Sequence, residues 1–178
     1  MRRKLIFLHL VFAGFMAPAF IMLAVSGGLY LMGQKGTLES TEVALPAGAA
    51  LDFGADTLED DVRALLADAG IDHGFEYVRN RGTSIDLRPT SRTYLSIRQT
   101  PDGLRATRHD PDLQKSMIEL HKGHGPRVFK LYQKVVAFTL ITVVLGGVLV
   151  GLLARMWRKT TIISLIVGTA VFGLLALL

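Results

Sequence analysis

Three long runs of uncharged, mostly apolar residues constrain this chain more than any other feature of its sequence. Residues 5–32, 135–154 and 160–178 contain no Asp, Glu, Lys or Arg. About twenty apolar residues in a helix are enough to cross the hydrocarbon core of a bilayer. We therefore expect a membrane α-helical protein with three spans, in which one long polar segment and one short basic loop separate the spans.

The charged residues predict how these spans are oriented. All 15 acidic residues lie between Glu39 and Glu119, whereas residues 1–4 and 155–159 carry six basic residues and no acid. By the positive-inside rule, both basic elements lie in the cytoplasm. We expect a protein of the bacterial inner membrane with a cytoplasmic N-terminus, a periplasmic main domain and a periplasmic C-terminus. The excess of positive charge flanks the spans, so the sequence offers no basic patch for a nucleic acid.

The first apolar run can be interpreted in two ways. A basic start followed by an apolar centre is typical of a cleaved signal peptide, but this run is longer and lacks a small-x-small cleavage site at the usual distance. We expect an uncleaved signal anchor, bent at Pro18. Small residues around Pro18, and the pair Gly147 and Gly151, favour close helix contacts, either in a bundle within one chain or in a homodimer.

The polar segment predicts a small α+β domain. A polar linker, residues 33–41, comes first, and the acidic sequence at Asp56 starts a helix that Gly70 ends. Four short runs with turn residues between them then predict an antiparallel meander of three or four strands. The apolar stripe of the helix is Leu58, Val62, Leu65 and Leu66, and the four runs are residues 75–80, 83–89, 93–99 and 104–109.

A second helix is predicted to join this domain to the second span. Asp110 before Pro111 is a start signal, and Leu113, Met117 and Leu120 recur on one stripe, so the helix should reach about residue 122 and pack against the domain. The predicted organisation is a signal anchor, the domain and a two-span hairpin, at residues 1–32, 33–126 and 127–178.

A resemblance to a known family follows from these residues. Leu8-His9 stands at the head of the first span, an α-β-β-β unit follows, and Leu120-His121-Lys122-Gly123 precedes the glycine-rich second span. In these features and in their order the chain resembles the PepSY-associated transmembrane proteins, in the short form with one PepSY-like domain.

The resemblance implies a membrane-anchored extracytoplasmic binding or accessory module that acts on a partner protein or membrane complex. Soluble PepSY modules are associated with inhibiting or regulating secreted peptidases. Larger relatives are similar to ferric-siderophore reductases, which bind haem b through histidines at their spans. The alternative is therefore a haem b-binding component of transmembrane electron transfer, linked to ferric-iron or siderophore reduction, with His9 and His121 as haem ligands. The second and third spans contain no histidine, which favours the binding module.

Helix geometry restricts what these histidines can do. The rise from His9 to Tyr30 is about 32 Å, so His9 and His121 cannot hold one iron within a monomer. His121 and His124 are instead spaced to share a helix face and to bind a divalent metal, with Glu119 as the nearest carboxylate. Alternatively, His121 hydrogen-bonds the outer loop or caps its helix. His73 and His109, which we place in turn regions, give no stronger signal.

Enzyme chemistry has little support in the sequence. The chain lacks cysteine, a serine nucleophile elbow, a phosphate-binding glycine loop and a zinc-protease motif. We therefore expect a protein without catalytic residues whose partners are the lipid bilayer and a membrane or extracytoplasmic protein.

Overall fold

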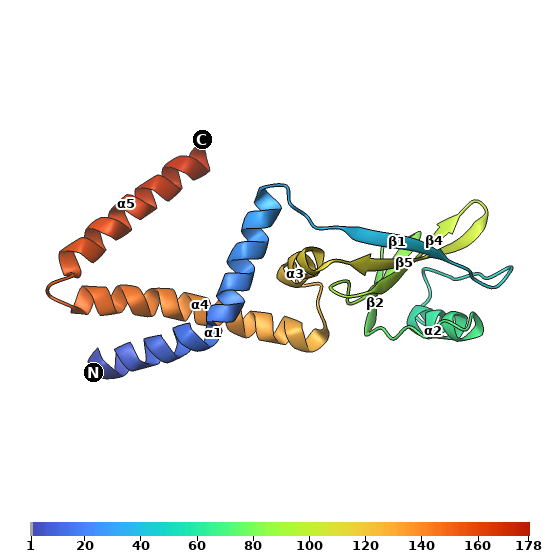
Figure 1. The fold of residues 1–178 in the computed structure, drawn as a ribbon, viewed down its shortest axis with the longest axis horizontal. Coiled ribbons are helices and arrows are strands. Elements are labelled where there is room, and N and C mark those ends of the chain that lie inside the picture. Colours follow the sequence, from blue (N-terminus) through green and yellow to red (C-terminus); the bar gives the residue numbers. More distant parts are fainter. Residues whose placement is uncertain (1) are drawn as a thin grey trace. The chain divides into compact units, whose positions relative to one another are not determined.

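The computed structural model describes residues 2–178, and these form two compact units (Figure 1). One unit contains residues 2–21 and Lys134–Leu178, and the other contains Met22–Gln133. Both boundaries fall inside helices, α1 (Arg2–Leu31) and α4 (Arg127–Leu153). The last turns of α1 and the first turns of α4 therefore belong to the same unit as the polar segment.

The apolar runs form three helices, as predicted. Ile6–Leu31 of α1, the whole of α4 and α5 (Arg158–Leu177) are each long and apolar enough to cross a membrane. At most 11% of the most apolar window of each helix is buried within the structure. A helix that is apolar around its whole circumference and yet exposed is typical of contact with lipid, which supports membrane association.

Glycine allows close approach between two of these helices. An added Cβ on Gly151 of α4 would lie 2.4 Å from Oγ1 of Thr161 on α5. Because real Cβ atoms do not come this close, a larger residue at Gly151 would force either the Thr161 side chain or the helices themselves to shift near their connecting loop.

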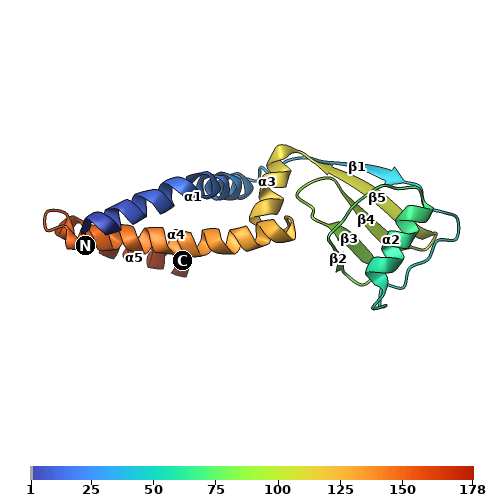
Figure 2. The same cartoon turned by 90° about the horizontal axis from the view of Figure 1, so that it is seen from below.

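The polar segment contains a five-stranded antiparallel sheet in the order β1-β5-β4-β3-β2 (Figure 2). Strands β2 to β5 form the predicted meander, with a turn at Gly103, whose φ is +115°. The strands are β1 (Leu38–Val43), β2 (Tyr77–Asn80), β3 (Ser84–Arg88), β4 (Tyr94–Thr100) and β5 (Gly103–Pro111).

The strand β1 corrects the sequence prediction, which placed a linker over residues 33–41. It pairs with β5 from Leu38 opposite Pro111 to Val43 opposite Ala106. Five of its six residues are exposed, because β1 is an edge strand. Without a buried face it shows no alternation of apolar and polar residues, which is the pattern that identifies a strand from sequence.

The core lies between the sheet and α2 (Leu58–Asp68), which covers one face of the sheet (Figure 2). The predicted stripe of α2 is buried at Leu58, Val62 and Leu66, and Gly70 follows the helix with φ of +67°. Alternate strand residues complete the cluster, as the pleat requires. The sheet and its connections contribute Phe75, Ile85, Leu87, Leu95, Ile97 and Ala106.

The helix α3 (Leu113–His121) begins later than predicted because β5 continues to Pro111. The N-cap is Asp112, whose Oδ1 accepts a hydrogen bond from Lys115 N at 2.6 Å and whose Oδ2 accepts one from Thr37 N at 2.7 Å. The residues of α3 that are buried also differ from the predicted ones. Leu113 is 79% exposed, whereas Ile118 is 2% exposed, so the predicted stripe is wrong at its first residue.

Candidate functional site

His121 is the last residue of α3, and it contacts α1. Its Nδ1 atom lies 2.9 Å from Oγ of Ser26, and Ser26 is only 1% exposed. An added Cβ on Gly27 would lie 3.2 Å from Cε1 of His121, so the imidazole lies against this glycine. The sequence left open a bond to the outer loop or a helix cap, and the hydrogen bond goes to neither: it goes to α1.

A small cavity lies beside this contact. Its volume is about 210 Å³, below the range of about 300–1,000 Å³ that is typical of sites for drug-sized ligands. It is lined by Ser26, Gly27, Tyr30, Ile118, His121 and Lys122. One histidine therefore faces a confined space next to the last turns of α1.

His9 lies in the other compact unit, on α1, and it also packs against glycine. An added Cβ would lie 3.3 Å from Cε1 of His9 at Gly147 and 3.8 Å from its Nδ1 at Gly146. Within residues 2–178, the buried Nδ1 of His9 has no hydrogen-bond partner. A buried polar nitrogen without a partner costs free energy.

Haem b ligation by His9 and His121, which the family resemblance implies, stays a prediction. A metal-ligating histidine normally donates its second ring N–H to a neighbouring acceptor, and the buried Nδ1 of His9 has no partner among the described residues. The cavity beside His121 is small and is lined by one histidine.

The second predicted pair, His121 and His124, is engaged by two different partners. His124 Nδ1 lies 2.6 Å from Oε2 of Glu119, whereas His121 Nδ1 faces Ser26. Across residues 2–178, no group of three or more His, Cys, Asp or Glu side chains is arranged to hold a metal ion. Metal binding by His121 and His124 alone stays a prediction.

Glu119 is the centre of a polar cluster in α3. Its carboxylate is nearly buried and accepts hydrogen bonds from Thr90 Oγ1 at 2.9 Å and Lys122 Nζ at 3.1 Å, in addition to the bond with His124. Lys115 Nζ lies 3.7 Å from the same carboxylate. This cluster ties α3 to the segment after β3 and to the turn that leads into α4.

The pKa values show which groups carry charge. Burial alone would raise the pKa of Glu119, but the hydrogen bonds from His124, Lys122 and Thr90 outweigh burial and lower the pKa to about 2. Burial lowers the pKa of His124, and the hydrogen bond to Glu119 only partly offsets this effect. At neutral pH, a neutral His124 therefore donates its Nδ1–H to an ionised Glu119.

In the sequence, Glu119 stands out only as the carboxylate nearest to two histidines. A signal was present, because Lys115 and Lys122 stand four residues before and three residues after it on one helix face. Ser26 was missed completely. Its signal is weaker, since one hydroxyl in an apolar helix can also bond its own backbone, as Ser26 does with the carbonyl of Leu23.

Four further hydrogen bonds join the domain to the first turns of α4. All four pair a group of α4 with a group of the domain in the same compact unit. They are Arg127 N to Glu76 Oε2 at 2.7 Å, Gln133 Nε2 to the carbonyls of Leu120 at 2.6 Å and His121 at 3.4 Å, and Lys130 Nζ to the Tyr77 hydroxyl.

His109 lies in β5 and not in a turn region, which corrects the prediction. Its ring stacks on Tyr94 with centroids 4.7 Å apart. Nδ1 lies 2.8 Å from Ser40 Oγ and Nε2 lies 2.8 Å from Ser96 Oγ, so both ring nitrogens are occupied. His109 therefore holds β1, β4 and β5 together and has no free nitrogen for a ligand. His73 lies in the loop between α2 and β2, as predicted.

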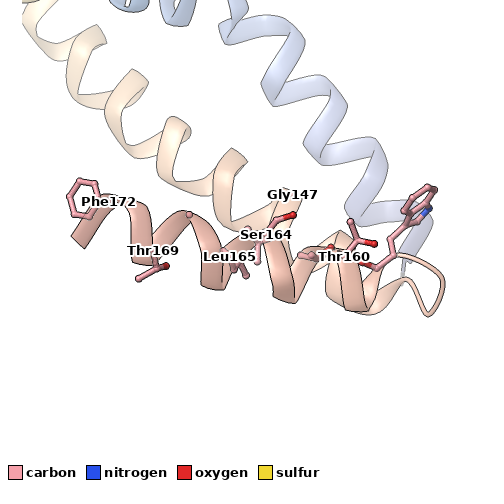
Figure 3. Close-up of a pocket in the computed structure, with 10 residues that line it drawn as sticks. Gly147, Thr160, Ser164, Leu165, Thr169 and Phe172 are labelled. Atoms are coloured by element: carbon pink, nitrogen blue, oxygen red, sulfur yellow. Dashed lines mark hydrogen bonds between the residues drawn. The ribbon is translucent and has the colours of Figure 1, made fainter. Parts of the chain in front are cut away.

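A groove of about 620 Å³ separates parts of α4 and α5 (Figure 3). Its walls include Gly147 of α4 and Thr160, Ser164, Thr169 and Phe172 of α5. Thr161 Oγ1 already donates to the carbonyl of Trp157 at 2.9 Å. No titratable side chain lines the groove, so it offers hydroxyls and apolar surface but no acid–base chemistry.

Comparison with known proteins adds no relative: no family model, no curated protein and no solved structure matches this chain.

Proposed function

We propose that this protein is a membrane-anchored binding module, in which a PepSY-like extracytoplasmic domain is held at a membrane surface to bind a partner protein or membrane complex. One observation carries this proposal: side-chain hydrogen bonds fasten the sheet domain to the ends of two apolar helices. His121 bonds Ser26 of α1, and Glu76 and Leu120 accept hydrogen bonds from α4.

Hydrogen bonds that fix the domain to the helices have an effect on binding that a flexible linker does not have. A domain on a flexible linker loses orientational freedom when it binds, and this loss weakens binding. A domain already fixed to α1 and α4 has lost part of that freedom before the partner arrives. These hydrogen bonds therefore support a role in which the orientation of the domain matters.

The exposed strands offer the surface for a partner. Helix α2 covers one face of the sheet only, and both edge strands carry exposed charged residues, Glu42 on β1 and Arg79 on β2. Charged groups around an interface mainly set which partner is chosen and how fast it associates. This surface suits a protein partner better than it suits catalysis.

A photo-crosslinking amino acid at Glu42 or Arg79 tests the proposal in membranes of the native host. We expect a discrete crosslinked product from at least one of these sheet positions and none from the matched position Asp68, which is exposed on α2. The yield of the crosslinked product should fall in the variants Glu76→Ala and Ser26→Ala, because these changes loosen the domain. The amount of protein in the membrane should stay unchanged. Absence of any discrete adduct, or equal adducts from Asp68, would contradict partner binding through the strands.

A further inference from the structure

The face of the sheet that α2 leaves uncovered contains a pocket of about 390 Å³. The side chains that line it come from the turn after β2 and from β3, β4 and β5. They alternate with the buried core residues, as expected for the second face of a pleated sheet. Among them are Arg81, Ser84, Asp86, Ser96, Arg98, Arg105 and Thr107.

Three arginines line this pocket, and two of them form ion pairs with neighbouring carboxylates. Arg81 lies 2.9 Å from Asp86, and Arg105 lies 2.9 Å from Glu42. Arg98 makes no ion pair with any carboxylate in the described part of the chain, residues 2–178, and it is exposed. The pocket therefore holds one cation whose charge nothing in the described chain offsets.

The position of Arg98 is unfavourable for folding. On β4 it stands directly opposite Arg105 of β5, and like charges in directly opposite positions destabilise a sheet. The arrangement has no benefit for the fold that we can identify. A bound anion would remove the repulsion, which is a physical reason for two arginines to face the same space.

Two hydroxyl groups without partners in residues 2–178 stand on the strands on either side of Arg98. Ser84 lies directly opposite Arg98 on β3, and Thr107 lies two residues beyond Arg105 on β5. Neither hydroxyl has a partner among the described residues, whereas Ser96 bonds His109 and Thr100 bonds the carbonyl of Gly103. Donors therefore approach the pocket from three adjacent strands.

We propose that this pocket binds the phosphoryl group of a small molecule, either inorganic phosphate or a phosphate monoester. The guanidinium of Arg98 matches two phosphate oxygens with paired N–H groups, and the hydroxyls of Ser84 and Thr107 supply donors on both sides. A phosphoryl group presents three acceptor oxygens, which suits this set better than the two of a carboxylate. A volume of about 390 Å³ leaves room for an organic group on the phosphate. This site goes beyond the proposed function and does not depend on it.

Calorimetric titration of the full chain in a non-ionic detergent tests the site with three probes: inorganic phosphate, glycerol 3-phosphate and acetate. We expect saturable phosphate binding with a Kd below about 1 mM and at least about tenfold weaker binding of acetate. Tighter binding of glycerol 3-phosphate would identify a monoester as the ligand, and equal or weaker binding would identify free phosphate.

Matched variants locate the binding. Arg98→Gln should weaken phosphate binding by about tenfold or more, whereas Arg108→Gln should leave it unchanged. Arg108 is a fair control because it lies on β5 with its side chain on the α2 side of the sheet, paired with Asp110 at 3.1 Å. The double variant Ser84→Ala with Thr107→Val should weaken phosphate binding by less than Arg98→Gln does, and it leaves the charge of the pocket unchanged.

Thermal unfolding separates lost binding from lost folding. Without phosphate, Arg98→Gln should unfold at the same or a higher temperature than the unchanged chain, because the repulsion from Arg105 is gone. No saturable phosphate binding, equal binding of acetate, or equal losses in Arg98→Gln and Arg108→Gln would each overturn the proposal.

Discussion

The Nδ1 atom of His121 and the hydroxyl oxygen of Ser26 lie 2.9 Å apart and join the end of α3 to α1. The bond pairs a residue of the polar domain with an almost fully buried residue of an apolar helix. Any change that separates these two groups should therefore loosen the domain from α1.

Alanine at two neighbouring glycines tests this contact. An added Cβ at Gly27 would lie 3.2 Å from the ring of His121, whereas one at Gly28 meets nothing within 4 Å. Alanine favours a helix over glycine by about 1 kcal/mol, so Gly28→Ala should be neutral or stabilising. Gly27→Ala should be less stable than Gly28→Ala by about 1 kcal/mol, the usual value of a hydrogen bond, in thermal unfolding followed by circular dichroism. Equal stability of the two variants would show that His121 does not anchor the domain.

Glu119 should make stability depend on acid pH. Hydrogen bonds hold its pKa at about 2, below the usual range of glutamate, so the stability from its ionised form is complete above about pH 5 and is lost as pH falls toward 2. Glu119→Gln should lower the free energy of unfolding by about 1–3 kcal/mol at pH 7. It should also make the stability depend less on pH between about pH 5 and pH 2.

The control for this prediction is Glu39→Gln, which alters an exposed residue of β1. Urea unfolding at several pH values measures both variants. If Glu39→Gln changes the pH dependence as much as Glu119→Gln does, the polar cluster around Glu119 is not its source.

A reporter fused after Leu178 tests the proposed orientation. Three spans from a cytoplasmic N-terminus place the C-terminus outside, so a reporter that works only in an oxidising compartment should be active and a cytoplasmic one silent. A matched fusion in the basic loop after Arg155 should give the opposite pattern. Cytoplasmic activity at Leu178 would refute the proposed topology.

Absorption of the detergent-purified protein distinguishes a binding module from an electron-transfer component. We expect a colourless protein, since the rise from His9 to Tyr30 is about 32 Å and the second and third spans contain no histidine. His9→Ala and His121→Ala should then leave the spectrum unchanged. A stoichiometric reduced-minus-oxidised haem signal that either substitution abolishes would make electron transfer the working hypothesis.

Periodicity predicted those elements whose side chains have one consistently buried face. The stripe of α2 and the alternation around Leu95 and Ile97 were visible in the sequence because the core requires them. The three apolar helices were visible for a different reason: length and the absence of charge are enough to identify them.

The parts that escaped prediction depend on contacts between distant residues. Strand β1 has no buried face, and α3 starts as late as Leu113 only because β5 continues to Pro111 in order to pair with Leu38. The candidate site shows the same dependence. The spacing of His121 and His124 made His121 a candidate site residue. No local pattern could show that its hydrogen-bond partner is Ser26, which is 95 residues away in the sequence.

The strand order has a consequence for the order in which the domain is completed during synthesis. Strand β1 pairs only with β5, the last strand to be made, so its backbone groups have no sheet partner until residue 111 has left the ribosome. Pairing between such distant segments is slow, because a long loop must close before any contact forms. For that interval the nascent chain exposes an unpaired strand next to α1, and this is the stage at which truncation or delayed synthesis should lead to aggregation.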